Sequence, residues 1–195
     1  MNVKIIGIGG CGRNILNTLI DEGLSPKNAI FIDTDINAKP SIKSDNFIQL
    51  GESVFKGRGT GCNQEKGQLA AMLNPWDITN AIEGADTVIL IAGIAGGVGG
   101  GALPFITSLS VEYIGAKTIA FAVMPAEVEG KGRKEKAETA LTNLKAALDE
   151  ENIHVITAPG TLATMFDNTD KLVAEKIKTF ISPSSAKKDL ILQNM

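Results

Sequence analysis

The stretch Val3-Lys4-Ile5-Ile6-Gly7-Ile8-Gly9-Gly10-Cys11-Gly12 decides the fold that we predict for this chain of 195 residues. Its apolar half is typical of a buried strand in a parallel sheet. An amphipathic helix is expected after the glycines, over Arg13–Glu22. Glycines between a strand and a helix let backbone N–H groups approach a phosphate, beside the partial positive charge of the helix N-terminus. The stretch therefore predicts a phosphate-binding strand-turn-helix unit.

The rest of the chain repeats this alternation of strand and helix. Further strands are expected over Ala29–Ile32, Phe47–Leu50, Thr87–Ile91, Lys117–Val123 and Ile153–Thr157. Helices are expected over Gln64–Met72, 77–83, Leu103–Ile114, Lys134–Leu148 and Lys171–Ile181. Because the strands lack period-two alternation, the pattern predicts an α/β fold, a Rossmann-like, mostly parallel sheet with helices on both faces. We expect one domain over residues 1–181 and a C-terminal tail over 182–195.

The composition excludes several classes of protein. Hydrophobic residues make up 44% of the chain, the net charge is −3 and the pI is about 5.3. An acidic chain does not favour binding to nucleic acid, and the apolar runs are too short for membrane insertion. Two cysteines form no disulfide scaffold, so a reducing cytoplasm is expected, and zinc-ligand spacing is absent.

A second glycine-rich stretch, Gly93–Gly101, also joins a strand to a helix. Seven of its nine residues are glycine or alanine, so only backbone groups are available to contact a ligand there. Such backbone N–H groups form anion-binding nests. A dinucleotide needs one loop of this kind for its pyrophosphate. Three glycine loops, the third at Gly57–Asn63, indicate a mononucleotide polyphosphate held from several sides.

Five segments in chain order resemble motifs of the FtsZ/tubulin family, and of FtsZ more closely. Gly9–Asn14 is similar to the family's G-G-G-G-N, Asp33–Ala38 to N-T-D-x-x-A, Gly57–Gln64 to G-x-G-A-G-A-N-P, Ala95–Gly101 to G-G-G-T-G-T-G, and Val128–Arg133 to F-E-G-x-x-R. The resemblance implies the family's GTPase-domain fold and a bound GTP or GDP, with Mg²⁺ left open.

The resemblance also implies roles for particular residues. The phosphates are expected at Gly9, Gly10, Cys11 and Gly12 and at Gly96, Gly97, Val98 and Gly99, with Gly61, Cys62 and Asn63 near the terminal phosphate. Glu129 is expected at the ribose hydroxyls, Arg133 near ribose or phosphate, and Asn14 beside the base. Aligning Leu172–Glu175 with the family's central helix puts Glu175 at the base-binding acid and Lys171 at an aromatic position.

The sequence differs from the family pattern in two ways that affect the expected GTP hydrolysis. Val98 and Gly100 replace both threonines of the family signature, which removes two hydroxyls from the phosphate loop. The sequence also ends at Met195, before the catalytic loop and second domain that the resemblance implies. We therefore expect no catalytic residue in this chain, little GTP hydrolysis by it alone, and a role in assembly or cell division with itself or a full-length FtsZ-like protein as partner.

Two other readings stay open at this point. Asp33 lies 21 residues after Gly12, about where a Rossmann domain places its ribose-binding acid. On this hypothesis the chain is a small NAD(P)-binding oxidoreductase that binds its cofactor at Gly7–Gly12, and the hypothesis assigns no function to Gly93–Gly101. Val98 and Lys171 suggest a further alternative, a structural protein that no longer binds nucleotide.

Overall fold

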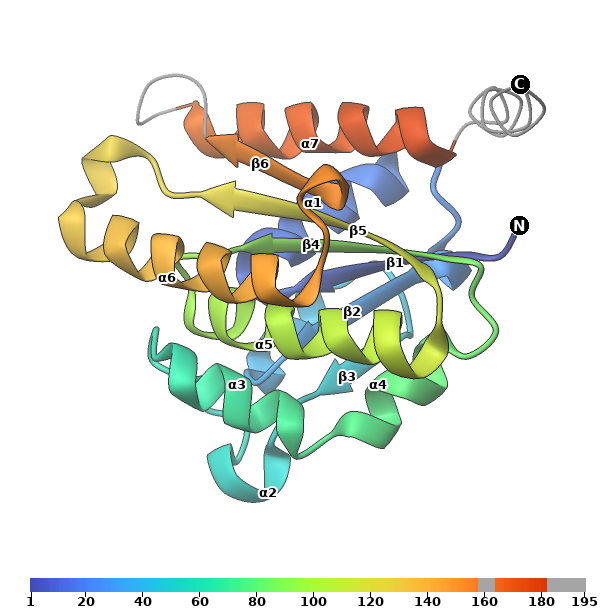
Figure 1. Ribbon diagram of the computed structural model, residues 1–195, viewed down its shortest axis with the longest axis horizontal. Helices are drawn as coiled ribbons and strands as arrows, with labels where there is room; N and C mark the ends of the chain where they lie inside the picture. The colour runs from blue at the N-terminus through green and yellow to red at the C-terminus, as the bar shows by residue number, and fades with distance from the viewer. Residues whose placement is uncertain (158–163, 182–195) are drawn as a thin grey trace.

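The computed structural model describes residues 1–157 and 164–181, so the expected tail over 182–195 lies outside the described residues. Six strands form one sheet: β1 (Val3–Ile8), β2 (Ala29–Asp33), β3 (Phe47–Gln49), β4 (Thr87–Gly93), β5 (Lys117–Met124) and β6 (Ile153–Thr157). All neighbours pair in parallel, in the order β3-β2-β1-β4-β5-β6 (Figure 1). The carboxyl ends of the strands therefore share one edge, where open α/β sheets bind ligands.

Helices cover both faces of the sheet, as the sequence predicts. They are α1 (Gly9–Asp21), α2 (Glu52–Phe55), α3 (Gln64–Met72), α4 (Pro75–Ile82), α5 (Gly97–Ser108), α6 (Lys131–Ala147) and α7 (Met165–Ile181). Short helical turns also occupy Pro26–Asn28, Ile36–Ser41, Leu109–Ile114, Glu127–Glu129 and Glu150–Asn152. Helices α1 and α7 pack on one face, and α3 to α6 on the other.

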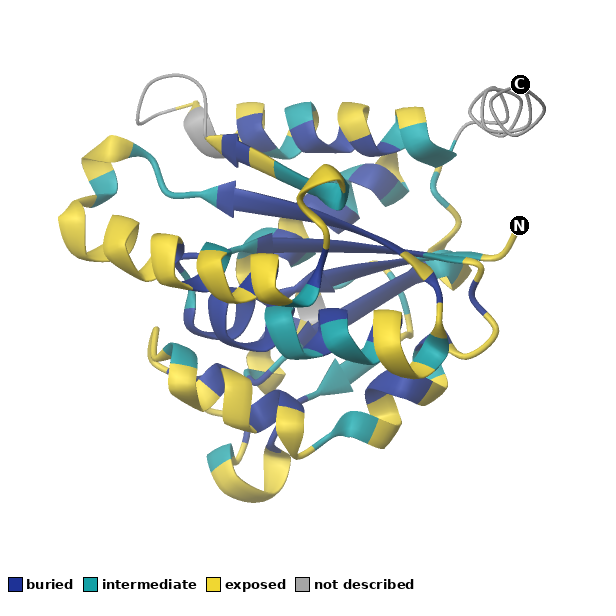
Figure 2. Cartoon of the chain, viewed as in Figure 1, coloured by how far each residue is buried: buried dark blue, intermediate teal, exposed yellow. Residues whose placement is uncertain are grey.

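The strands are buried on both sides, which explains their unbroken apolar sequences. Ile5 of β1 belongs to the core beneath α1 and α7, whereas Ile6 and Ile8 belong to the core beneath α3 to α6. Figure 2 shows the central strands dark along their length, with exposed residues confined mainly to the outer helix faces. The fold is thus the predicted doubly covered parallel sheet.

Five helices begin earlier than the sequence predicts. Helix α4 begins at Pro75 rather than at residue 77, α6 at Lys131 rather than Lys134, and α7 at Met165 rather than Lys171. The other two are the helices that begin with glycines. Helix α1 begins at Gly9 rather than Arg13, and α5 at Gly97 rather than Leu103, so both expected boundaries are wrong. Glycine has a low intrinsic helix propensity, and a run of glycines is therefore predicted as loop. Here the first turn of α5 is buried against α3 and β4, and tertiary packing overrides the propensity.

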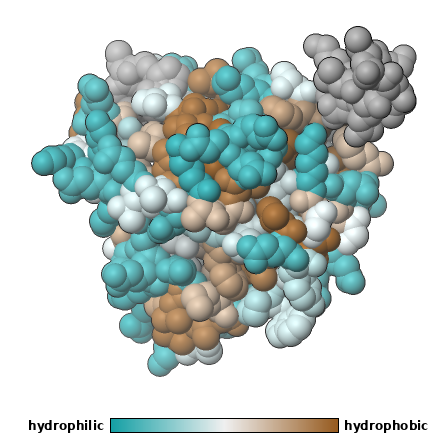
Figure 3. Space-filling model, viewed as in Figure 1, coloured by the Kyte–Doolittle hydropathy of each residue, from teal (hydrophilic) through white to brown (hydrophobic). Residues whose placement is uncertain are grey.

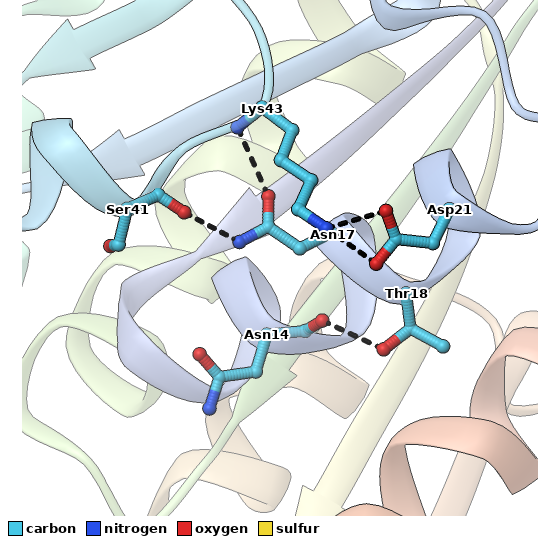
Figure 4. Close-up of polar contacts among 6 residues, drawn as sticks. All are labelled: Asn14, Asn17, Thr18, Asp21, Ser41 and Lys43. Atoms are coloured by element: carbon cyan, nitrogen blue, oxygen red, sulfur yellow. Dashed lines mark hydrogen bonds and ion pairs between the residues drawn. The ribbon is translucent and has the colours of Figure 1, made fainter.

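Polar contacts fix α1 against the chain between β2 and β3 (Figure 4). Asn17 donates from Nδ2 to the Ser41 carbonyl at 2.7 Å and accepts at Oδ1 from the Lys43 N–H at 3.2 Å. The ammonium of Lys43 pairs with the Asp21 carboxylate. These contacts attach the C-terminal half of α1 to the segment between β2 and β3.

The surface carries both hydrophilic and hydrophobic residues. Figure 3 shows apolar atoms gathered low on the visible face, over α2 and α3, where Val54 and Leu69 are exposed. Among the residues that the structure describes, no helix combines the length and apolar character needed to cross a bilayer.

Candidate functional site

Two helix N-termini meet at the carboxyl edge of the sheet. Gly9 opens α1 with φ of 68°, and a Cβ there would lie 3.3 Å from the Gly99 nitrogen of α5. Neither helix has an acidic residue in its first turn or a side-chain cap from the described residues. The first N–H groups of a helix lack intrahelical partners and carry a partial positive charge. This pair of helix starts is thus suited to an anion.

A cavity of about 390 Å³ opens over these two helix starts. Ten of the expected site residues line it: Gly9, Gly10, Cys11, Asp33, Cys62, Gly96, Gly97, Val98, Gly99 and Arg133. Arg13, Thr34, Asp35, Gly59 and Thr60 also line it, although sequence reasoning did not single them out. Segments from five separate parts of the chain therefore meet at one cavity, which we call the phosphate cavity.

A second cavity of about 230 Å³ adjoins the first and shares Cys11, Gly93 and Arg133 with it. It is lined further by Asn14, Ala95, Val123, Met124, Pro125, Glu129, Thr169 and Asp170. We call it the inner cavity. The two cavities share a wall; the phosphate cavity is lined by glycine backbone with Asp33 and Asp35, and the inner cavity by Glu129 and Asp170.

Glu129 is held in place at the wall of the inner cavity. Its Oε1 accepts from the Ala126 N–H at 2.9 Å, and its Oε2 pairs with Nε of Arg133 at 2.8 Å. The carboxylate is largely buried, with 19% of the side chain exposed. A positioned carboxylate is a suitable acceptor for a diol, and a guanidinium for phosphate oxygens.

Asp170 is a candidate residue that sequence reasoning missed. It lines the inner cavity from α7, and burial, with a smaller contribution from Asp167, raises its pKa to about 6. Glu175, which the alignment placed at the base-binding acid, is exposed and lines neither cavity. The sequence spacing could have identified Asp170, because it lies three and seven residues before the buried Val173 and Ile177 and so shares their face of the helix.

Three other expected residues lie beside the phosphate cavity rather than on its wall. A Cβ on Gly12 would lie 2.3 Å from the Ile91 carbonyl oxygen, so Gly12 serves helix–strand packing. The Asn63 side chain caps α3 by accepting from the Lys66 N–H at 2.9 Å. Gly61 lines a separate groove between α3 and α6.

The two replaced threonines have different surroundings. Val98 is buried, packs with the core beneath α3 to α6, and presents an apolar side chain to the phosphate cavity. At Gly100, a Cβ would lie 2.2 Å from Nε2 of Gln64 and 2.4 Å from the Ile94 carbonyl oxygen. Gln64 instead donates to that carbonyl at 2.8 Å. The amide of Gln64 thus occupies space that a side chain at position 100 would need.

The two cysteines of the phosphate cavity differ in accessibility. Burial raises the pKa of Cys11 to about 12, with smaller contributions from Asp170 and Glu129, whereas Cys62 is exposed. Because the thiolate is the reactive form, we predict that a thiol reagent at pH 8 modifies one cysteine, Cys62, in the native protein and both after denaturation. Mass spectrometry of the alkylated peptides checks this, and equal labelling of both native thiols would contradict it.

Within residues 1–157 and 164–181 there is no group of three or more histidine, cysteine, aspartate or glutamate side chains placed to hold a metal ion. Asp33 and Asp35 line the phosphate cavity as a pair of acids. Hard cations such as Mg²⁺ take few protein ligands when substrate phosphates supply the others. Asp33 and Asp35 could therefore supply some of the ligands of a cation that is bound mainly by the phosphates of a nucleotide.

The sheet order, the paired helix starts and the cavity above them are typical of α/β domains that bind a nucleotide at the carboxyl ends of their strands. Residues 2–154 match the family model described as Tubulin/FtsZ family, GTPase domain. The chain belongs to this family.

Individual relatives agree with this assignment. The cell division protein FtsZ of Mycoplasmopsis pulmonis (strain UAB CTIP) is 40% identical over 148 residues, which is 76% of this chain and 37% of that protein. An empty FtsZ dimer from M. jannaschii superposes with a TM-score of 0.83 at 29% identity, covering 91% of this chain and 53% of that one. This chain thus spans about a third to a half of the length of these relatives.

A more distant neighbour shares the fold. CetZ2 from Haloferax volcanii, solved as a GTPγS-bound protofilament, superposes with a TM-score of 0.81 at 17% identity and covers 97% of this chain and 62% of that one. The predicted fold class, a Rossmann-like sheet of the tubulin/FtsZ GTPase-domain type, is confirmed.

Proposed function

We propose that the chain binds a guanine nucleotide, GTP or GDP, with the phosphates in the phosphate cavity and the nucleoside in the inner cavity. The observation that carries this proposal is the meeting of the uncapped α1 and α5 N-termini beneath a cavity lined by glycine backbone. Family membership supports the same ligand class. Residues 1–181 form the nucleotide-binding domain in this proposal.

The inner cavity supplies the groups for the nucleoside. Glu129 accepts hydrogen bonds from the ribose hydroxyls, and Arg133 reaches the ribose or the first phosphate from the same position. Guanine presents two neighbouring donors, N1–H and the exocyclic amine. The ionised carboxylate of Asp170 accepts both, and Asn14 contacts the base from α1.

We further propose that this chain hydrolyses GTP slowly by itself. Val98 presents no hydroxyl to the phosphates, and Gly100 has no side chain. Hydrolysis of this type requires an acid that activates water, and in this proposal no side chain of residues 1–157 or 164–181 has that role. Any Mg²⁺ binds with the nucleotide and offsets charge on its phosphate oxygens.

The chain acts, in this proposal, in the cytoplasm as part of a cytoskeletal or cell-division assembly. Its partner is itself or a full-length FtsZ-like protein, in keeping with the dimer and protofilament states of its solved neighbours. The nucleotide face is the surface that meets the partner. The net charge of −3 does not favour nucleic acid as a partner.

Chromatography of the small molecules released from purified, never-refolded protein tests the proposal. Near-stoichiometric GDP or GTP is expected, with Glu129→Gln losing it and Glu127→Gln, a neighbouring exposed glutamate, retaining it. Release of NAD(P) would overturn the proposal in favour of an oxidoreductase. If the protein released no nucleotide and failed to bind added GTP, the result would favour a structural protein that only contacts other proteins.

The pH dependence of binding follows from Asp170. Its raised pKa of about 6 means that the acceptor form is lost as the pH falls through this value. We expect GDP affinity to be constant above about pH 7 and to fall about tenfold per pH unit well below 6. Titration calorimetry between pH 5 and 8 measures this, and a profile flat down to pH 5 would rule out Asp170 as the base-binding acid.

A further inference from the structure

The side chain of Arg13 lines the phosphate cavity from the second turn of α1. Its guanidinium folds back toward the start of the helix, since a Cβ added to Gly10 would lie 3.9 Å from Nη2 of Arg13. The first N–H groups of α1 have no side-chain cap from the described residues. A guanidinium and a helix N-terminus, two groups that both attract anions, therefore lie side by side at this cavity.

The positive charge of Arg13 is not offset by an ion pair. Arg133, which lines the same cavity, pairs with Glu129 at 2.8 Å. Arg13 forms no ion pair within residues 1–157 and 164–181, although Asp33 and Asp35 also line the cavity. A cation beside the positive end of a helix dipole is destabilising. A bound anion would relieve this repulsion.

Two hydrogen bonds hold the guanidinium in position. Nε and Nη2 of Arg13 both donate to Oδ1 of Asn14 at 3.3 Å. Because a guanidinium has five N–H donors, these bonds leave three for a ligand. The planar, paired donors of arginine match two oxygens of one phosphate, and an arginine that is already oriented loses less side-chain freedom when it binds.

The rest of the phosphate cavity supplies few side-chain donors. Its glycines contribute backbone alone, and Val98 presents an apolar side chain. The family motif G-G-G-G-N, which Gly9–Asn14 resembles, contains no arginine, so the resemblance assigns no role to this residue. Arg13 therefore adds a charged donor to a cavity in which the signature's threonine hydroxyl at position 98 is absent.

We propose that Arg13 is a phosphate-binding residue, whose guanidinium donates to a phosphate held at the N-terminal turn of α1. The preference of the site for a nucleotide over its nucleoside then depends on this side chain. The inference rests on the proposed function, since it adds a ligand contact to that same site. Hydrogen bonds to charged groups are strong enough that losing this contact should lower the affinity on the order of 10- to 100-fold.

Competition against fluorescently labelled GDP, which gives the affinities of unlabelled GDP and of guanosine, tests the proposal. Arg13→Gln should lower GDP affinity about 10- to 100-fold and change guanosine affinity by less than about threefold, because guanosine has no phosphate. Arg13→Lys should lie between wild type and Arg13→Gln, since an ammonium keeps the charge but lacks the paired donors. Arg58→Gln is the matched control and should behave as wild type, because Arg58 is exposed and lines neither cavity.

The outcomes separate this inference from the proposed function. Unchanged GDP affinity in Arg13→Gln would show that Arg13 does not contact a phosphate. Equal losses for GDP and guanosine would show that Arg13 acts through Asn14 or the fold instead, and either result would overturn the inference while leaving nucleotide binding intact. Absence of GDP binding by the wild type would overturn the proposed function itself, and the inference with it. Thermal melting checks that each variant is folded, and Arg13→Lys keeps the test available if Arg13→Gln is not.

Discussion

Replacing Gly67 by alanine should destabilise the protein by about 3 kcal/mol, because α3 and α5 pack backbone against backbone at this position. A Cβ on Gly67 would lie 2.0 Å from the Gly97 carbonyl oxygen and 3.1 Å from the Val98 Cα. These are main-chain atoms, so no side chain can rotate to make space. The two helices must separate, and the buried contacts between them are lost. Urea denaturation followed by circular dichroism measures the change.

The same substitution should weaken nucleotide binding in whatever fraction of the protein stays folded. Helix α3 follows the loop that carries Thr60 and Cys62, and α5 begins at the floor of the phosphate cavity. A Cβ on Gly97 would lie 2.1 Å from Oγ1 of Thr60, so the two walls of the cavity are packed as tightly as the helices behind them. Separating the helices therefore displaces groups that surround the phosphates.

Gly132→Ala is the matched control for this prediction. Gly132 lies in α6, has no atom within 4 Å of an added Cβ and no positive φ. Alanine favours a helix over glycine by about 0.5–1 kcal/mol, so this variant should be slightly more stable than wild type. If Gly67→Ala proved as stable as Gly132→Ala, the close approach of α3 and α5 would not exist in solution.

Strands were predictable from sequence because their environment is uniform. β1, β4 and β5 are buried on both faces, and a continuous apolar run has few other uses in a chain of this composition. Helix α3 was predicted with its observed bounds, Gln64–Met72. The starts of α1 and α5 were predicted wrongly. A run of glycines predicts a loop unless its packing against a neighbouring backbone is known.

The site was predictable where backbone forms it and less so where side chains do. The glycine loops could be located from their spacing, and most of their residues line the phosphate cavity. Which acid of α7 faces the site depends on the rotation of that helix. Asp170 shares a stripe with Val173, Ala174 and Ile177, which are fully buried, whereas Glu175 lies on the exposed side. Helical periodicity predicts which acid faces the cavity, whereas alignment of the neighbouring residues with the family motif does not.

Replacing Asp170 by asparagine should reduce GDP affinity on the order of 100-fold in the proposed binding mode. Two hydrogen bonds from guanine to an ionised carboxylate become one bond to a neutral amide oxygen, and the amide N–H meets a guanine donor. Hydrogen bonds to charged groups contribute about 1.5–3 kcal/mol each, which sets this magnitude. Calorimetry at pH 7.5, above the pKa of about 6, measures the loss with Asp170 ionised in the wild type.

The same substitution should create a preference for a different base. Xanthine carries an acceptor oxygen where guanine carries its exocyclic amine, so the asparagine amide can donate to that oxygen while its carbonyl accepts from N1–H. Asp170→Asn should therefore bind xanthosine diphosphate more tightly than GDP, the reverse of wild type. Asp167→Asn, an exposed acid one turn earlier in α7, should keep the guanine preference. Weakened binding of both nucleotides without this reversal would mean that Asp170 acts on the shape or charge of the inner cavity rather than on the base edge.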